Sequence, residues 1–454
     1  MISQTKCTKK EIKIQDKKYS ISCDLDTQSS DFGLIITSKI DEKIGLTKGL
    51  SKILTDLRDQ RYVIHKLEEI LKQRIYEIVQ GYEDCNDHQE LRKDQLLQLT
   101  VKNEKNVLLA SQPTLCRFEN EINKMTKTEE VSKSLRVYEM EEYLMDFYVN
   151  SLSSETRSIK LDIDGTADKV HGNQQLSFFN GYYHNKVFYP ILVFDASNNR
   201  LASALLRPGN SGGYEDAPLI LSRLIEKIKK RFPKCRITIR ADAAFGCSLF
   251  LDFLDELNIK YGKISYEIGI SGNNNLKKIA KPKLLKLKKQ IENCKGIKYV
   301  KKYYTTNYQA ESWSKKRRII FKVEVNETKS NTRFVVTNYR KSPKETYKTY
   351  CQRGMMENWI GDFKNSINGD RLSCSDWFAN QIRFYLFCFA YVLMNEIRLL
   401  MNGTEFYKMR LWNLRNKLLK VAVSIKVTSR CVRLRLPSNY PYKDYWDKII
   451  SLLV

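Results

Sequence analysis

The chain has 454 residues, which is enough for roughly two or three domains with sizeable cores. Its hydrophobic content of 42% is ordinary for a globular protein, but 78 Lys and Arg against 52 Asp and Glu give a net charge of +26. Such an excess attracts polyanions, of which nucleic acid is the commonest, because phosphate neutralisation releases counterions. A basic peripheral membrane protein is the weaker alternative, since the positive charge is spread along the chain and not gathered in one amphipathic segment.

Cysteine usage and hydropathy exclude further classes. The 11 cysteines include no Cys-x2-Cys pair, and the 4 histidines offer no partner at zinc spacing, so we expect no thiolate zinc site. Unpaired thiols suit a reducing cytoplasm. The first residues are polar and lack the apolar region of a secretory signal, and the longest apolar run, Phe384 to Met394, is too short to span a bilayer. We therefore expect a cytoplasmic protein without a membrane segment, in which this run is a buried core helix.

The N-terminal part divides into a polar arm and a helical region. Residues 1–32 show short alternating stretches and predict an arm or strand. Residues 33–152 have helical apolar spacing, with helices expected at 50–57, 67–79 and 129–152 and a helix start at 111–114. A basic, helix-rich domain is typical of DNA recognition, although a packing or dimerisation domain explains the same pattern equally well.

Strand-like alternation begins at Ile159 and defines the fold class. The predicted elements are strands at 159–164, 187–195 and 200–206, a helix at 215–231, a strand at 236–242, a helix at 248–257 and a strand at 260–265. Three strands, helix, strand, helix, strand is the order of an RNase H-like mixed sheet, and strand–helix alternation independently indicates an α/β fold. We assign the core to residues 153–269 and 346–405.

Two further segments surround this core. Residues 270–345 predict a β-rich insertion, with a basic helical stretch at 277–289 and alternating runs at 318–325 and 332–339. Residues 406–454 predict a C-terminal basic hairpin and helix. The lysine-rich stretch could follow a DNA backbone, but such a run is usually only a solvated face.

Two acidic residues end strands that are neighbours in an RNase H-like sheet. Asp164 ends the first strand and Asp242 ends the fourth, so their carboxylates should converge, and Glu357 on a later helix can pack over the same edge. Three oxygen ligands of this kind would hold two Mg²⁺ or Mn²⁺ ions roughly 3.5–4 Å apart. For any single Asp at a strand end, turn chemistry is the simpler explanation. The hypothesis therefore depends on all three together.

The spacing Tyr350-x2-Arg353-x3-Glu357-x6-Lys364 supports that hypothesis. At about 100° per residue, all four side chains would share an arc about 60° wide on one helix. An acid flanked by two cations and a phenol suits a metal-bound phosphodiester. The alternative is a solvated helix face whose charges align by coincidence.

These residues resemble those of bacterial DDE transposases with an RNase H-like catalytic core. The likeness is to the insertion-sequence 4-like class that carries the Tyr-Arg-Glu-Lys signature, and most closely to its insertion-sequence 1380 group. Beyond the signature, the stretches that carry the resemblance lie at 81–84, 111–120, 161–166, 171–174, 179–182 and 207–210, so that it covers roughly residues 33–450.

The resemblance implies a role for each matching residue. Asp164, Asp242 and Glu357 would be the catalytic, metal-binding triad, with Mg²⁺ or Mn²⁺ as the cofactor, two ions per site. Asp162 competes for the first place because it lies on the same strand face, but Gly165-Thr166 after Asp164 fits the family's pattern better.

The resemblance also implies residues that contact DNA. Tyr350, Arg353 and Lys364 would contact phosphates of the transposon end. Trp313 in the insertion is the candidate aromatic for holding a flipped base, and a core tryptophan of a small β domain is an equally good interpretation.

The implied activity is cut-and-paste transposition of an insertion sequence. The partners would be double-stranded DNA, as terminal inverted repeats and as target, and a second copy of the chain, because two ends must be joined. Two alternatives remain open: a structure-specific nuclease of the same fold without strand transfer, and a DNA-binding protein whose catalysis has decayed. Retention of all three acids argues against decay.

Overall fold

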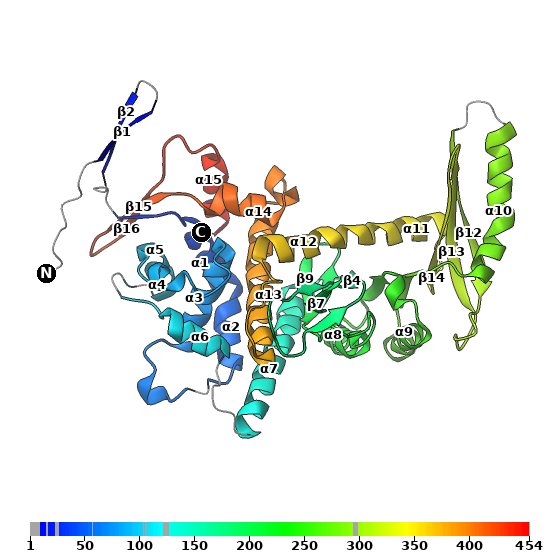
Figure 1. Cartoon of the computed structure of the whole chain (residues 1–454), viewed down its shortest axis with the longest axis horizontal. Helices are drawn as coiled ribbons and strands as arrows, with labels where there is room; N and C mark the ends of the chain where they lie inside the picture. The colour runs from blue at the N-terminus through cyan, green and yellow to red at the C-terminus, as the bar shows by residue number, and fades with distance from the viewer. Residues whose placement is uncertain are drawn as a thin grey trace.

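The computed structural model describes residues 10–14, 17–22, 27–56, 58–102, 104, 107–120, 127–293 and 298–453 of an elongated molecule (Figure 1). The N-terminal helices lie at one end, a mixed sheet occupies the middle, and a helix packed on three long strands forms the other end. The long helix α13 (Trp377–Leu400) stands at the junction of the first two parts, where it contacts α1, α3 and α7. It includes the apolar run Phe384 to Met394, whose expected place in the core is confirmed.

The N-terminal region is helical, as predicted. Its helices are α1 (Gly33–Ile44), α2 (Leu46–Ile53), α3 (Leu67–Gln80), α4 (His88–Leu91), α5 (Gln95–Lys102), α6 (Gln112–Asn120) and α7 (Lys127–Ser151), with a 3₁₀ turn η1 (Gln60–Tyr62). Helix α3 ends where Gly81 takes a φ of 102°, a conformation that residues with a Cβ rarely adopt. The polar arm contributes the hairpin β1 (Lys10–Ile14) and β2 (Lys17–Ile21).

The central sheet has the RNase H-like order. Its core strands are β4 (Ser158–Gly165), β8 (Ile191–Asp195), β9 (Arg200–Leu205), β10 (Arg236–Ala241) and β11 (Ile264–Ile270). They lie in the order β9-β8-β4-β10-β11, with β4, β10 and β11 parallel and β8 antiparallel to both of its neighbours. The predicted α/β fold class is confirmed.

One predicted strand is in fact two. We expected a single strand over 187–195, but β7 (Asn185–Phe188) ends before Pro190 and β8 begins after it. Proline has no N–H to donate to a ladder, which explains the break. Strand β7 instead joins a small sheet with β5 (Asp168–Lys169) and β6 (Phe178–Asn180).

The insertion extends the central sheet and contains a long helix. Strands β12 (Tyr299–Tyr308), β13 (Arg317–Asn326) and β14 (Ser330–Thr337) follow α10 (Asn274–Asn293). Because β14 pairs antiparallel with β11, these strands and the core form one eight-stranded sheet. The sequence predicted the basic helical stretch and the last two strands but missed β12.

Helices cover both faces of the sheet (Figure 1). Helices α8 (Ala217–Arg231) and α9 (Ser248–Tyr261) pack on one face, and α11 (Pro343–Cys351) and α12 (Met356–Ile367) lie across the other. Alternation along β4 explains the division, because Leu161 and Ile163 enter the core with α8 and α9. Asp162 and Asp164 therefore point to the face that α11 and α12 cover.

The helix expected to carry the four-residue signature is not continuous. A 3₁₀ segment, η3 (Gln352–Met355), separates α11 from α12. The expectation of one α-helix with four side chains on a single arc is therefore wrong, since a 3₁₀ turn advances about 120° per residue instead of 100°. Each signature residue must be placed from its own contacts.

The C-terminal region returns to the N-terminal arm. Its elements are η4 (Glu405–Lys408), α14 (Leu411–Leu414), a π-helical turn η5 (Arg415–Leu419), β15 (Val423–Val427), β16 (Val432–Arg435) and α15 (Lys443–Leu453). Strand β15 pairs with β16, as the predicted hairpin, and also with β3 (Gln28–Ser29). Within the described ranges, no helix is both long and apolar enough to cross a membrane.

Candidate active site

Asp164 and Asp242 meet at the carboxyl edge of two neighbouring parallel strands. The β4–β10 register pairs Asp162 with Arg240, which brings Asp164 level with Asp242 just beyond the paired residues. Asp242 caps the 3₁₀ turn η2 (Ala243–Phe245), where its Oδ1 accepts the N–H of Ala244 at 2.9 Å. The predicted convergence of these two acids is present.

The electrostatics of this pair favour a cation. Burial and, after it, the nearby Asp242 carboxylate raise the pKa of Asp164 to about 6, whereas Arg353 opposes the shift. Arg353 lies in η3 and donates from Nη1 to Asp164 Oδ2 at 2.9 Å. The guanidinium thus supplies the positive charge that two adjacent carboxylates require.

Tyr350 completes this cluster from the end of α11. Burial raises the pKa of its hydroxyl, with Arg353 opposing the shift and Asp242 adding to it, so the hydroxyl lies near both groups. It lies directly over Gly269 of β11, where a Cβ would overlap the phenol oxygen. Glycine at this position is what lets the tyrosine approach the sheet.

Asp162, the alternative first acid, is committed to a structural ion pair. It is fully buried, and both of its oxygens accept from Arg240, at 2.6 Å from Nε and 2.8 Å from Nη2. Arg240 also donates to the carbonyl of Thr349, which ties α11 to the sheet. This pairing leaves Asp164 as the first acid of the cluster.

Lys364 stabilises the segment that follows β4. Its ammonium donates to the carbonyl of Ala167 at 2.6 Å and to the hydroxyl of Thr166 at 3.3 Å, and it lies 3.1 Å from Asp168 Oδ1. Asp168 is fully buried, and burial raises the pKa of this carboxyl to about 7. The lysine is therefore engaged with the protein itself in this structure.

The third predicted acid stays apart from the other two. Glu357 lies exposed on the first turn of α12, four residues after Arg353, and it has no hydrogen bond or ion pair with the described residues. Across the described part of the chain, no three Asp, Glu, His or Cys side chains group closely enough to hold a metal ion. The structure thus joins Asp164 and Asp242 with Arg353 and Tyr350, but does not place Glu357 with them.

The family follows from the comparison of this sequence with known ones. Residues 13–454 match the family described as transposase DDE domain group 1. The chain belongs to this family. No curated protein matches this sequence. Among solved structures, the chain is similar to a piggyBac transposase in a synaptic complex with hairpin DNA, with 11% identity, 84% of this chain and 79% of that chain covered, and a TM-score of 0.43.

DDE transposases act on DNA by phosphoryl transfer and generally use divalent metal ions. The cluster of this family member fits such an ion in its donor chemistry. Asp164 and Asp242 provide hard oxygen ligands beside one another, and burial together with the Asp242 carboxylate raises the pKa of Asp164. Asp164 and Asp242 are the residues of this cluster that would hold a divalent ion.

Trp313 does not offer a face to a base. It is 7% exposed and packs edge-on against Tyr308, with ring centroids 5.7 Å apart. Both belong to the core formed by α10, β13 and the sheet. The structure therefore favours the core interpretation of Trp313 over the predicted contact with a flipped base.

The sequence analysis did not predict an aromatic side chain, Tyr189, that lies beside Asp164 and Asp242. The ring of Tyr189 lies against Gly165, where a Cβ would come within 2.8 Å of it. Arg207 lies 5.2 Å from the centre of the Tyr189 ring and donates to the tyrosine's carbonyl at 3.0 Å. The stretch Arg207-Pro208-Gly209-Asn210 was the only sequence feature that pointed to this place. Its spacing could not reveal that Arg207 packs on Tyr189.

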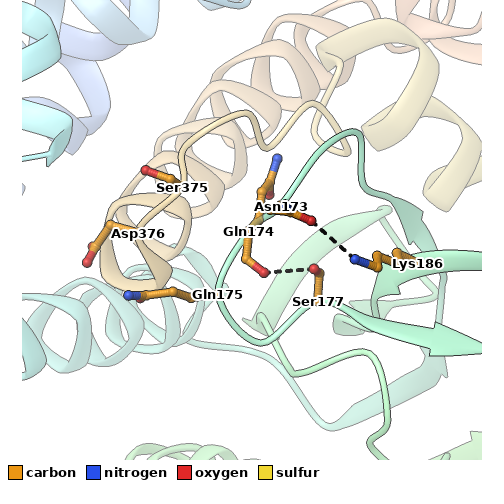
Figure 2. Close-up of a pocket in the computed structure, with 7 residues that line it drawn as sticks. All are labelled: Asn173, Gln174, Gln175, Ser177, Lys186, Ser375 and Asp376. Atoms are coloured by element: carbon orange, nitrogen blue, oxygen red, sulfur yellow. Dashed lines mark hydrogen bonds between the residues drawn. The ribbon is translucent and has the colours of Figure 1, made fainter.

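An open polar pocket of about 430 Å³ lies between the β5–β6 connection and the start of α13 (Figure 2). It is lined by Asn173, Gln174, Gln175, Ser177, Lys186, Ser375 and Asp376. Gln174 donates to the carbonyl of Leu372 at 2.9 Å, and Gln175 accepts the N–H of Trp377 at 3.0 Å. These bonds fix the segment before β6 against α13.

Proposed function

We propose that this protein is a cut-and-paste transposase of a bacterial insertion sequence, of the insertion-sequence 1380 group. The observation that carries the proposal is the meeting of Asp164 and Asp242, with Arg353 and Tyr350 beside them, in a chain that belongs to the DDE family along most of its length. Glu357 would join the two aspartates when DNA and metal bind. Its side chain is exposed on the first turn of α12, where it has no hydrogen bond with the described residues that would have to break.

In this proposal the acidic residues hold metal ions, and the basic and aromatic residues hold DNA. Asp164, Asp242 and Glu357 would hold two Mg²⁺ or Mn²⁺ ions, which when bound lower the pKa of the attacking water or 3′-hydroxyl and stabilise the leaving oxygen. Arg353, once released from Asp164, would bind a phosphate of the transposon end in bidentate fashion. Tyr350 would position the same strand from above β11.

Successive reactions can use one site because each is an in-line displacement at phosphorus. Hydrolysis frees a 3′-hydroxyl, which attacks a phosphodiester of the opposite strand, so that a hairpin forms and the flanking strand leaves with a 3′-hydroxyl. Water then opens the hairpin and regenerates the 3′-hydroxyl, which attacks a phosphodiester of target DNA and displaces the 3′-oxygen there. Because two ends are joined to one target, we expect a homodimer on double-stranded DNA.

The decisive experiment compares Asp242→Asn and Glu357→Gln with the unaltered protein on DNA that carries the element's terminal repeats. Asparagine keeps the cap of η2, and glutamine in place of Glu357 keeps the size of an exposed side chain, so both variants should fold and bind the repeat. We expect Mg²⁺-dependent cleavage to fall at least about a hundredfold, as for loss of a catalytic electrostatic group. Glu327→Gln, on the exposed turn between β13 and β14, is the matched control.

Unaltered cleavage by either variant would remove that acid from the site. Pre-cleaved terminal DNA then separates the enzyme classes. Joining to target DNA supports the transposase, whereas cleavage without joining would make the protein a nuclease. Binding of the repeat with no metal response at all would indicate a decayed transposase.

A further inference from the structure

The hairpin formed by β6 and β7 exposes aromatic side chains beside the candidate active site. Tyr182 is 84% exposed and Phe179 is 65% exposed. Both lie on a short hairpin, in which Asn180 pairs with Asn185 across the turn. Large rings held this far into solvent are unfavourable for folding, so a group of them indicates a binding surface.

Three tyrosines connect the tip of this hairpin to the acids. Tyr182 contacts Tyr183 edge to face with centroids 4.9 Å apart, and Tyr183 lies 6.4 Å from Tyr189. Tyr189 packs against Gly165, the residue after Asp164. The Asp164 carboxylate contributes to the raised pKa of both Tyr183 and Tyr189, after burial and a neighbouring tyrosine. We call Tyr182, Tyr183 and Tyr189 the aromatic row.

The turn holds the row in place. Asn180 Oδ1 accepts the N–H groups of Tyr182 at 3.1 Å and Tyr183 at 3.4 Å, and Asn185 donates to the carbonyl of Tyr183 at 3.2 Å. The base of the hairpin is fixed through the polar pocket, where Lys186 donates to Asn173 at 3.3 Å (Figure 2). A surface that is already ordered loses little conformational entropy when it binds.

The charge on this surface selects the chemistry of the occupant. The segment 176–188 contains no acidic residue, and it carries Lys186 and His184, both exposed. Exposed rings next to a cation suit a ligand with flat apolar faces and a negative backbone. Single-stranded DNA has this chemistry, since every base offers a face for stacking whatever its identity.

We propose that the aromatic row, with Lys186, binds unpaired bases of the DNA strand whose phosphate reaches Asp164 and Asp242. This inference rests on the proposed function, because it needs DNA at the two acids. The expected ligand is a duplex end with an unpaired extension, bound without strong sequence preference.

The test measures binding and not catalysis. The full-length protein is titrated, without divalent metal, into a fluorescent duplex with a single-stranded thymine extension and into its blunt counterpart. We expect the unaltered protein to prefer the extended duplex, and Tyr182→Ala to lose about 5- to 100-fold of affinity for it, as for loss of one stacked base. Tyr182→Phe, which keeps the ring, should retain the preference.

Two controls keep the outcomes distinct. Ile259→Ala removes an apolar side chain of similar exposure, 82%, from α9 and should leave both affinities unchanged. The inference would be overturned if the unaltered protein bound both DNAs equally, or if Tyr182→Ala kept the preference for the extended duplex. In either case, binding of the blunt duplex would leave the proposed function unaffected. Failure to bind either DNA would count against both.

Discussion

In this structure Arg353 is the counter-charge of Asp164, from which we expect it to separate when metal and DNA bind. Asp164 is held between burial and the Asp242 carboxylate, which favour its protonated form, and Arg353, which favours the charged form. The Arg353 and Asp164 side chains are only 15% and 19% exposed, so water screens the pair weakly. A metal ion and a DNA phosphate would compete for the two halves of this one ion pair.

This competition predicts the effect of removing the guanidinium. Arg353→Ala should bind Mn²⁺ about tenfold more tightly than the unaltered protein when DNA is absent, since one charge-assisted hydrogen bond no longer has to break. The same variant should bind terminal DNA less tightly. Calorimetric titration with Mn²⁺ measures the first effect, and Arg353→Lys, which keeps the charge, is the control. A Mn²⁺ affinity unchanged in Arg353→Ala would show that Asp164 is not the ion's ligand.

Glu267 is a second buried acid with a clear consequence. It stands in register beside Arg240, which in turn pairs with Asp162. Arg240 donates its hydrogen bonds to Asp162 and to a backbone carbonyl. As a result, neither Glu267 oxygen has a hydrogen bond with the described residues. Burial raises the pKa of Glu267 to about 7, although Arg240, Lys160 and Lys341 oppose the shift and Asp162 adds to it.

The sign of this shift fixes a pH dependence of stability. The folded protein keeps the Glu267 proton up to about pH 7, whereas the unfolded chain releases it near pH 4.5. The contribution of this proton to the free energy of unfolding is therefore fully present below pH 4.5 and is lost as pH rises through 7. At about 1.4 kcal/mol per pKa unit, the loss is on the order of 3 kcal/mol.

Glu267→Gln should therefore resemble the unaltered protein at pH 4.5 and exceed its free energy of unfolding at pH 8 by about 1–3 kcal/mol. Urea unfolding at the two pH values measures this, with the exposed Glu327→Gln as control. A pH-independent effect would mean that packing, and not the proton, governs this position.

At the scale of elements, the sequence was informative where a local pattern determines local structure. Alternation placed β4 and β10 and put Asp164 and Asp242 at their ends, because the apolar side chains of each strand point to one face and its register is thereby fixed. Trp313 shows the limit, since nothing in its neighbours reveals that Tyr308 covers it. Glu357 and Arg353 show another, because helical spacing could not foresee the 3₁₀ segment between α11 and α12.

That 3₁₀ segment carries a prediction of its own. Gly354 is exposed within η3, and a Cβ there would meet no atom within 4 Å. Gly354→Ala should raise the free energy of unfolding by about 0.4–1 kcal/mol, because alanine restricts the unfolded chain without strain in the folded one. Thermal or urea unfolding measures the change.

Gly369, just after α12, is the matched comparison. A Cβ there would overlap the ring of Phe363, which is fully buried. The same substitution should therefore destabilise by about 1–3 kcal/mol. A destabilised Gly354→Ala would mean that η3 needs a conformation that only glycine provides.

On the scale of the whole molecule, one part of the charge of +26 lies on a single helix at one end. Helix α10 lies at the end of the molecule opposite the N-terminal helices (Figure 1). It buries Leu276, Ala280 and Leu287 against the sheet extension and turns its lysines to solvent. An elongated molecule that bound DNA at both the candidate active site and this distant end would engage a long stretch of duplex.

The salt dependence of DNA binding tests whether this end touches the duplex. Lys278, Lys281 and Lys288 are exposed on α10, and their combined replacement by glutamine should lower the slope of log affinity against log salt by roughly 0.9 for each phosphate that is no longer neutralised, up to about 3. The control replaces Lys230, Lys234 and Lys260, which are exposed on or beside α8 and α9. It changes the net charge equally, so any effect of total charge alone would appear in both variants. A slope that falls only in the α10 variant places duplex DNA along this helix, and equal slopes would leave its lysines as a solvated surface.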